Sequence, residues 1–367
     1  MHRNLAPGVH SLSNEIVPFH RKGAPKRASK PGFELPALID RAGDQARRRF
    51  LDFFAATIRN ANTREAYARA VAQFFRWAEL QGLKRLDDLE PFMVGAYIEQ
   101  LGTTGLPEHL ALMGWSGRGR PPLVDQAYSP ASIKQSLAAI RKLFDWLVTG
   151  QVLAVNPAAP VKGPRYSVTV GLTPVLDEDQ AKALIAAIDV ETTAGIRDRA
   201  LIGVLVYSFA RISATVNMKV EDYYYEKKFW WFRLAEKGGK RHAVPAHHKA
   251  YEYMEEYLDA ADLRGAKGTP LFRSVDRYRL FTDRSLSRND ALKMVKRRAK
   301  AAGIEPGLAE RLCNHSFRAT GITNFIENGG SVEKAQQIAA HRDVRTTKLY
   351  DRSNDELTLD EIERIKI

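Results

Sequence analysis

The most informative stretch of the sequence, residues 315–350, reads HSFRATGITNFIENGGSVEKAQQIAAHRDVRTTKLY. It contains the pair His315-x-x-Arg318, a second histidine, His341, and a tyrosine nine residues further on, Tyr350. Arginine offers paired donors to phosphate oxygens, histidine can move a proton near neutral pH, and tyrosine can form a covalent intermediate. These residue types, gathered in one stretch, indicate chemistry on a phosphodiester.

Two residues upstream supply what such chemistry still requires: a second cation on the phosphate and an acid for the leaving oxygen. Arg211 follows the apolar run of residues 200–210, which predicts a helix over about 197–210 that Arg211 closes at the edge of the core. Lys237 lies at the tip of a predicted hairpin, EKGGK at residues 236–240, from where its ammonium could reach a leaving oxygen. Each residue alone has an ordinary structural explanation, so their order and spacing together favour a site.

The composition favours a polyanionic partner. The chain of 367 residues carries 56 Lys and Arg against 43 Asp and Glu, a formal net charge of +13. Such a balance attracts nucleic acid, although a basic but otherwise ordinary enzyme is the alternative. Cys313 is the only cysteine. An internal disulfide and a cysteine-based zinc site are therefore excluded, and we expect Cys313 to be a small packed side chain.

The sequence shows no membrane span and no signal peptide. Its apolar runs are far shorter than the roughly 20 residues that cross a bilayer. Residues 1–30 lack the apolar core of a signal sequence. We therefore expect a cytoplasmic protein of bacterial or phage origin, associated with the nucleoid and without a membrane partner.

The apolar pattern predicts a mainly α protein with a small β-sheet (α+β), in two domains. Residues 1–44 are rich in proline, glycine and basic residues and predict a mobile tail, which either touches DNA phosphates or has no specific role. Residues 45–160 predict a helical domain, whose clearest helix is capped by Asn62. Its long connection over residues 102–128 either follows a nucleic-acid backbone or is a surface excursion. Prolines and glycines predict a linker at residues 161–172.

Residues 173–353 predict the second domain. Strands at residues 229–234 and 242–245 flank the hairpin that carries Lys237. Helices are predicted near residues 178–188, 197–210, 248–263, 288–302, 315–328 and 332–340. Residues 354–367 predict a final amphipathic helix, which is acidic and should avoid DNA.

This arrangement resembles the tyrosine recombinase (phage integrase) family. HSFRAT at residues 315–320 is similar to the family's second conserved box, and HRDVRTTKLY at residues 341–350 is similar to the segment joining its last histidine to its nucleophile. The resemblance runs from about residue 45 to the C-terminus. Six residues carry it, in the family's order: Arg211, Lys237, His315, Arg318, His341 and Tyr350.

The resemblance implies a site-specific DNA recombinase or integrase. Tyr350 would attack the scissile phosphate, form a 3′-phosphotyrosyl link and release a 5′-hydroxyl. Arg211 and Arg318 would hold the non-bridging oxygens and offset the charge of the transition state, and His341 would add a further donor. Because the covalent link retains the phosphodiester energy, the reaction would need no cofactor, neither a metal nor ATP.

The resemblance also implies an acid and an assembly. Lys237 would be the general acid, with Lys240 a second candidate, and His315 would assist proton transfer. Residues 45–160 would be a core-binding domain that closes with the catalytic domain around double-stranded DNA recombination sites. Two sites would bring four protomers together as a homotetramer, with accessory proteins as further partners. The helix at residues 354–367 would dock on a neighbouring protomer, or alternatively on its own domain.

Three departures from the family pattern lie close to the candidate site. Ala214 stands where an acid is usual, and an acid there would support neighbouring groups of the site. Phe209-Ala210 replaces the usual Gly-Leu, and Ala340 replaces a glycine. The missing acid puts the fine tuning of the site in question rather than the reaction.

Other functions remain open from the sequence. A DNA-binding protein that kept the scaffold and lost catalysis is disfavoured because all six residues are present. A type IB topoisomerase or a hairpin telomere resolvase shares the chemistry, but the compact size and the separate helical domain favour a recombinase. A metal-dependent nuclease is disfavoured by the lack of a convincing carboxylate cluster.

Overall fold

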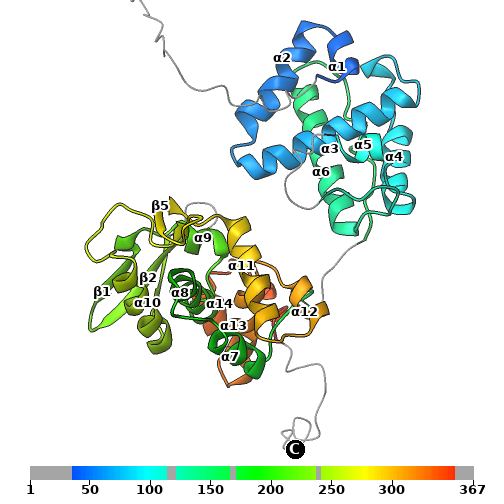
Figure 1. The fold of residues 1–367 in the computed structure, drawn as a ribbon. Coiled ribbons are helices and arrows are strands. Elements are labelled where there is room, and N and C mark those ends of the chain that lie inside the picture. The colour runs from blue at the N-terminus through cyan, green and yellow to red at the C-terminus, as the bar shows by residue number, and fades with distance from the viewer. Residues whose placement is uncertain (1–34, 114–120, 166–170, 237–240, 352–367) are drawn as a thin grey trace, which may run out of the picture. The chain divides into compact units, whose positions relative to one another are not determined.

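The computed structural model describes residues 35–113, 121–165, 171–236 and 241–351 (Figure 1). The chain forms two compact units, residues 1–167 and 168–367, and the division falls inside the segment 161–172. Each unit has a buried apolar core of its own. The predicted fold class is confirmed, because helices dominate and the two sheets are small and antiparallel.

Helices build the first unit around the two longest, α3 and α6. The rings of Phe74 on α3 and Phe144 on α6 meet edge to face, with their centroids 6.0 Å apart. Both helices present apolar residues at helical spacing, so that one face of each can be buried against the other. The elements of this unit are α1 (Ala37–Arg41), α2 (Asp44–Asp52), the π-helical turn η1 (Phe53–Thr57), α3 (Ala61–Leu80), the 3₁₀ turn η2 (Leu86–Asp88), α4 (Pro91–Thr103), α5 (Glu108–Ala111) and α6 (Pro130–Thr149).

Helix α1 lies inside the segment predicted as a mobile tail, residues 1–44, so the predicted end of the tail is too late in the chain. Leu38 and Ile39 of α1 are fully buried in the core of the first unit. An apolar pair is too short to show a helical period, so the sequence pattern missed this docked turn. Residues 1–34, to which the rest of the tail prediction applies, lie outside the described residues.

Two further details of the first unit differ from the prediction. Asn60, not Asn62, caps α3, because its side-chain oxygen accepts a hydrogen bond from the Thr63 amide at 3.1 Å while its backbone is still extended. The long connection over residues 102–128 contains the short helix α5, which buries Leu110. Neither alternative predicted for this connection foresaw that its first part is anchored in the core.

The second unit combines helices with two small sheets. Strands β2 and β3 pair antiparallel, with Ala235 opposite Arg241, and this confirms the predicted hairpin up to its tip. The tip itself, residues 237–240, lies outside the described residues. The elements are α7 (Glu178–Ala186), α8 (Thr193–Tyr207), α9 (Ile212–Val216), η3 (Val220–Asp222), β1 (Tyr223–Glu226), β2 (Phe229–Ala235), β3 (Arg241–Pro245), α10 (His248–Ala260), β4 (Arg273–Val275), β5 (Phe281–Ser285), α11 (Arg288–Ala301), α12 (Pro306–Arg311), α13 (Ser316–Glu327), α14 (Val332–Ile338) and α15 (Val344–Lys348).

Helix α8 is the central element of the second unit, and it packs against α10 and α13 (Figure 1). Most of its residues are buried, and those from Ala200 to Val206 are apolar or glycine, which is typical of a helix surrounded by protein. Helix α13 approaches it closely at Gly321, where a Cβ atom would overlap the Val206 carbonyl oxygen and meet the Phe209 ring at 2.8 Å. The absence of a side chain at this glycine therefore fixes the position of α13.

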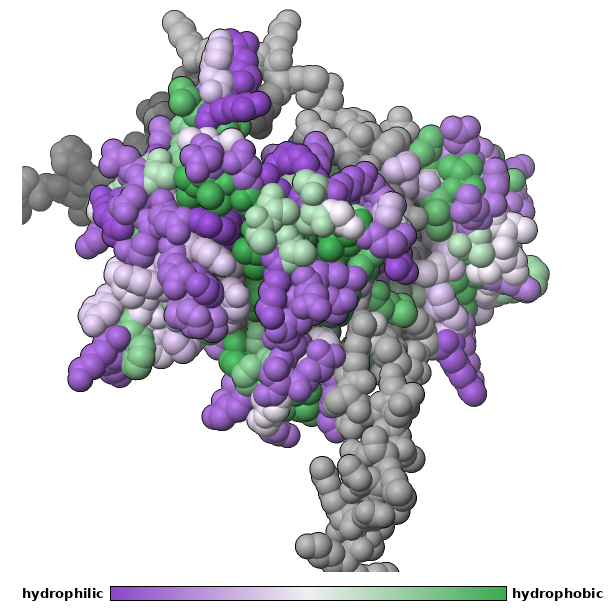
Figure 2. All heavy atoms as spheres, turned by 60° about the horizontal axis from the view of Figure 1, so that its bottom comes forward, coloured by the Kyte–Doolittle hydropathy of each residue, from purple (hydrophilic) through white to green (hydrophobic). Residues whose placement is uncertain are grey.

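The exposed surface is mainly hydrophilic on the face shown in Figure 2, where smaller hydrophobic patches lie between polar residues. Among the residues that the structure describes, no helix combines the length and the apolar character needed to cross a membrane.

Candidate active site

Arg211 lies at the start of a helix, which corrects the prediction that it closes one. Helix α8 ends at Tyr207, and Phe209 then adopts a left-handed backbone conformation with φ of 52°. Arg211 is the N-cap residue of α9, and its side chain is 28% exposed. The sequence hid this break, because residues 208–210 contain no glycine or proline that would indicate a turn. The turn directs the guanidinium of Arg211 toward the carboxylate of Glu236, with which it forms an ion pair.

Arg318 is the most deeply buried charged group of the candidate site. It belongs to α13 and is only 2% exposed. One end of its guanidinium donates to the carbonyl of Phe209, and the other donates to the carbonyl of Ala339 at 2.5 Å. Burial, and then repulsion from Arg211, lower its pKa to about 10, so Arg318 stays charged at neutral pH. Of its five N–H groups three remain for another acceptor, such as a phosphate.

His341 is buried beside these cations. Its Nδ1 lies 2.9 Å from the hydroxyl of Thr347, a side chain that is itself fully buried. Desolvation, followed by repulsion from Arg318 and Arg211, lowers the pKa of His341 to about 3. The ring is therefore neutral at physiological pH and carries one proton. If the Thr347 hydroxyl donates to Nδ1, that proton is on Nε2, where it can be donated to a substrate oxygen.

Tyr350 lies against His341. Their rings are stacked, with centroids 6.0 Å apart and an angle of 10° between the planes. The backbone of Tyr350 is tied at both ends, because its amide donates to the Thr347 carbonyl at 2.9 Å and its carbonyl accepts from the Thr323 hydroxyl at 3.0 Å. The side chain is half-buried. This tyrosine is therefore anchored by its main chain at the end of α15.

His315 occupies the N-cap position of α13, one turn before Arg318, and is exposed to solvent. Desolvation by the groups around its ring, and repulsion from Arg318, Arg211 and Arg288, lower the pKa of His315. The lowered pKa favours the neutral ring at neutral pH, which has one nitrogen that can accept a proton. Lys237 and its alternative, Lys240, lie outside the described residues.

The structure brings five of the six predicted residues into one electrostatic cluster. Arg211 and Tyr350 both act on the charge of Arg318, and the two arginines act on both histidines. These residues come from segments as far apart in the chain as α9 and α15. Two neighbouring cations can bind an anionic ester, and a tyrosine beside them can attack it.

Two residues of the cluster were missed by the sequence analysis. Glu236, only 7% exposed, is the partner of Arg211, and Thr347 is the partner of His341. Glu236 directly precedes Lys237, and Thr347 comes six residues after His341. Their closeness in sequence to predicted site residues was the only signal available. The fold shows that their side chains contact residues of the site.

Two of the departures from the family pattern carry backbone strain. Phe209 and Ala340 have φ values of 52° and 49°, in the left-handed region that glycine enters without cost. Phe209 itself supplies one of the two carbonyls that accept hydrogen bonds from Arg318. Ala340 directly follows Ala339, which supplies the other. The clamp on Arg318 therefore depends on two turns that this chain forms without glycine.

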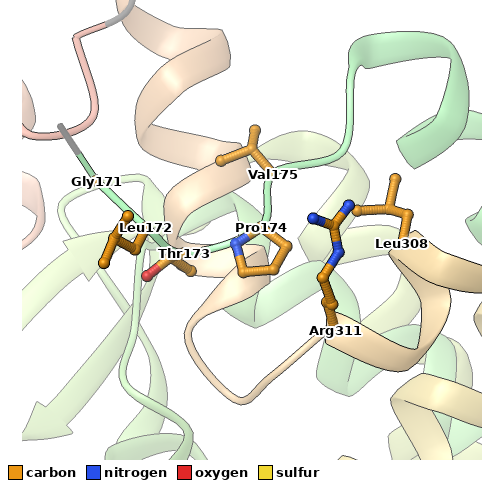
Figure 3. A pocket seen from close by; sticks show the side chains of 7 residues that line it. All are labelled: Gly171, Leu172, Thr173, Pro174, Val175, Leu308 and Arg311. Carbon is orange, nitrogen blue, oxygen red and sulfur yellow. The ribbon is translucent and has the colours of Figure 1, made fainter. Parts of the chain in front are cut away.

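A small cavity lies beside the segment that leads to Tyr350. It has a volume of about 270 Å³ (Figure 3). Gly171 at its rim donates its amide to the Leu349 carbonyl at 3.0 Å. None of the five clustered residues lines it, so this cavity is separate from the candidate active site. Its lining residues are Gly171, Leu172, Thr173, Pro174, Val175, Leu308 and Arg311.

Comparison with known proteins adds an independent observation. The sequence model of the Phage integrase family matches residues 174–356, which include all six predicted site residues. The chain is 28% identical, over 222 residues, to the tyrosine recombinase XerD of Listeria monocytogenes. This alignment covers 60% of the chain and 71% of that protein.

Solved structures show a similar fold. A pre-cleavage complex of the XerH site-specific recombinase with its difH substrate has a TM-score of 0.60 at 16% identity, and the match covers 90% of this chain and 96% of that one. A lambda integrase tetramer bound to a Holliday junction has a TM-score of 0.58 at 16% identity, with 84% and 78% of the two chains covered.

Proposed function

Because the chain belongs to the phage integrase family of tyrosine recombinases, we propose that it is a site-specific DNA recombinase whose nucleophile is Tyr350. One observation carries this proposal: the convergence of Arg211, Arg318, His341 and Tyr350 in one cluster of the second unit. The family relationship supports cleavage and rejoining of DNA. The cluster supports the particular residues that perform it.

Cleavage is a transesterification at one phosphate. The Tyr350 hydroxyl oxygen attacks the phosphorus, the bond to the 5′ oxygen breaks, and a 3′-phosphotyrosyl diester and a 5′-hydroxyl result. One ester bond forms for each that breaks, so the reverse attack by a 5′-hydroxyl of another strand rejoins the DNA without an external energy source. Lys237 gives the leaving oxygen its proton, and His315, whose pKa is lowered, assists the transfer of the tyrosine proton.

The remaining residues act on the phosphate itself. Arg318 and Arg211 stabilise the negative charge on the non-bridging oxygens. This stabilisation is strongest when the donors are held in position before the reaction. Two main-chain carbonyls hold the Arg318 guanidinium in this way. His341 is neutral and donates from Nε2, while its Nδ1 is held by Thr347.

DNA and further protomers complete the proposed enzyme. The net charge of +13 supports binding to double-stranded recombination sites, with the helical domain of residues 45–160 as a second DNA-binding part. XerH in complex with difH, and the lambda integrase tetramer on a Holliday junction, support strand exchange in a homotetramer. Exchange of the helix at residues 354–367 between protomers is part of the same proposal.

A trapping experiment tests the nucleophile. The protein is mixed with a nicked suicide substrate of its own recombination site, taken from the DNA flanking its gene, from which the cleaved 5′ end diffuses away. Wild type should accumulate a covalent protein–DNA adduct stable to denaturant, and Tyr350→Phe should form none. Absence of the adduct with wild type, or an adduct that persists in Tyr350→Phe, contradicts the proposal. Tyr278→Phe, at an exposed tyrosine elsewhere in the unit, is a matched control that should cleave normally.

A further inference from the structure

Glu236 is the one carboxylate that contacts a predicted phosphate-binding arginine among the residues that the structure describes. We propose that Glu236 is a positioning residue of the cleavage reaction, which holds the Arg211 guanidinium beside Arg318 for the incoming phosphate. This inference rests on the proposed function of the same site and extends it to a residue outside the six.

The ion pair lies mostly inside the protein. The Glu236 side chain is 4% exposed and that of Arg211 is 28% exposed. A buried carboxylate is costly unless it is paired, and the Arg211 guanidinium is the partner that offsets this cost for Glu236. The more exposed partner, Arg211, still has open surface from which N–H groups can reach a substrate.

The second role of Glu236 is electrostatic. Arg211 and Arg318 must converge on one phosphate, yet they repel each other, as the lowering of the Arg318 pKa by Arg211 shows. Glu236 acts in the opposite direction on the same arginine and raises its pKa. Two cations and one carboxylate leave a single net positive charge. Before a phosphate binds, Glu236 therefore reduces the repulsion between the two arginines, and the net positive charge that remains still attracts a phosphate.

The chain places this acid on an unexpected element. Ala214, three residues after Arg211 on α9, is buried and apolar and cannot support the arginine. The supporting carboxylate comes instead from the end of β2, 25 positions further along the chain. Glu236 directly precedes Lys237 in the sequence, so the residue that contacts Arg211 is adjacent along the chain to the predicted general acid. The absent acid of α9 is thus replaced in space by a residue of the sheet.

A double-mutant cycle tests whether Glu236 acts through Arg211. Single-turnover adduct formation on the suicide substrate is compared for wild type, Glu236→Gln, Arg211→Ala and the double variant. Glu236→Gln should slow cleavage on the order of 10- to 100-fold, as expected for a misplaced catalytic group. The double variant should be no slower than Arg211→Ala, because Glu236 has no guanidinium to position once Arg211 is removed. Additive losses, or a Glu236→Gln rate equal to wild type, overturn the proposal.

Two variants separate positioning from folding. Glu236→Asp keeps the charge and should recover a large part of the rate that Glu236→Gln loses. Glu226→Gln removes an exposed carboxylate at the end of β1 and should react like wild type. The DNA affinity of Glu236→Gln, measured by fluorescence anisotropy, should stay within a few fold of wild type. If Glu236→Asp is as slow as Glu236→Gln while equally well folded, the carboxylate is not what matters and the proposal fails.

A modified substrate separates Arg211 from Lys237 as the group on which Glu236 acts. Sulfur in place of the bridging 5′ oxygen leaves as a thiolate, which needs no proton from an acid. The defect of Glu236→Gln should persist on this substrate, because a poorly held Arg211 affects the phosphate itself. Full recovery on the sulfur substrate contradicts the inference and assigns Glu236 to the general acid instead.

The outcomes for the two proposals are distinguishable. No adduct with wild-type protein on any flanking DNA rejects the proposed function. A wild-type adduct that forms equally fast in Glu236→Gln rejects only the role of Glu236.

Discussion

The imidazole of His341 and the phenol of Tyr350 are stacked nearly parallel, with ring centroids 6.0 Å apart. His341 is buried and neutral, since its pKa is lowered to about 3, while Tyr350 is half-buried and held by main-chain hydrogen bonds. The histidine therefore packs against the predicted nucleophile and, as a neutral ring, has a single N–H group to donate. The tautomer decides which ring nitrogen carries this proton.

Thr347 is predicted to fix that proton. Thr347→Val replaces the hydroxyl by a methyl group of similar size. Nδ1 of His341 then loses its hydrogen-bond partner, and the orientation of the ring is no longer fixed. Single-turnover cleavage should slow on the order of 10- to 100-fold with little change in DNA affinity. Thr346→Val, at the exposed neighbouring threonine, is the control and should cleave at the wild-type rate. Equal rates for both variants would show that the Thr347 hydroxyl is dispensable.

The burial of His341 predicts a loss of stability in acid. Between pH ~6.5 and ~3 the unfolded chain protonates this histidine and the folded protein does not, so the free energy of unfolding falls as pH decreases. His341→Gln removes this proton uptake. Between pH 7.5 and 4.5 the wild type should lose about 3 kcal/mol more than the variant. Urea unfolding at a series of pH values measures the difference, and parallel pH dependences would contradict the lowered pKa.

Ala340 is predicted to strain the turn before His341. Its φ of 49° favours glycine, so Ala340→Gly should raise the free energy of unfolding by about 1 kcal/mol. Ala339→Gly is the matched control. Ala339 is buried, with a φ of −75° that is typical of a helix end, and its replacement by glycine should lower stability by about 1 kcal/mol. Urea unfolding of the two variants should therefore show shifts of opposite sign.

Gly321 is predicted to be required for the position of Arg318. A methyl group there would overlap the Val206 carbonyl and the Phe209 ring, so Gly321→Ala should destabilise the second unit by about 2–3 kcal/mol and displace α13. Cleavage should fall in parallel, even at temperatures where the variant is folded. Gly95→Ala, in α4 with open space around the new atom, should instead stabilise by about 0.5–1 kcal/mol. Unchanged stability of Gly321→Ala would contradict the close approach.

Binding to DNA is predicted to depend steeply on salt. If roughly 6–10 phosphates are contacted, the affinity should fall on the order of 10³- to 10⁵-fold between 50 and 200 mM salt. Fluorescence anisotropy with a labelled duplex measures the slope. A flat response would contradict a binding surface that neutralises phosphates.

The longer helices, the sheet hairpin and the six predicted site residues could be proposed from the sequence, because each rests on a local signal. Apolar residues at helical spacing predicted α3, and the aromatic run at residues 229–234 together with the glycines of the predicted turn indicated β2 and β3. Local signals failed where they were short or missing. The turn of α1 was too brief to show a period, and the break before Arg211 contains no glycine or proline.

What the sequence determined by itself is the set of chemical groups: two arginines, two histidines, a lysine and a tyrosine in a fixed order along a basic chain. Only the tertiary structure decided which side chains support them. The carbonyls of Phe209 and Ala339 hold Arg318, Thr347 holds His341, and Glu236 holds Arg211. Periodicity reports which face of an element is buried, but it does not report which distant segment meets that face. Partners of buried charges are therefore settled by packing, where an unpaired group would cost too much to remain.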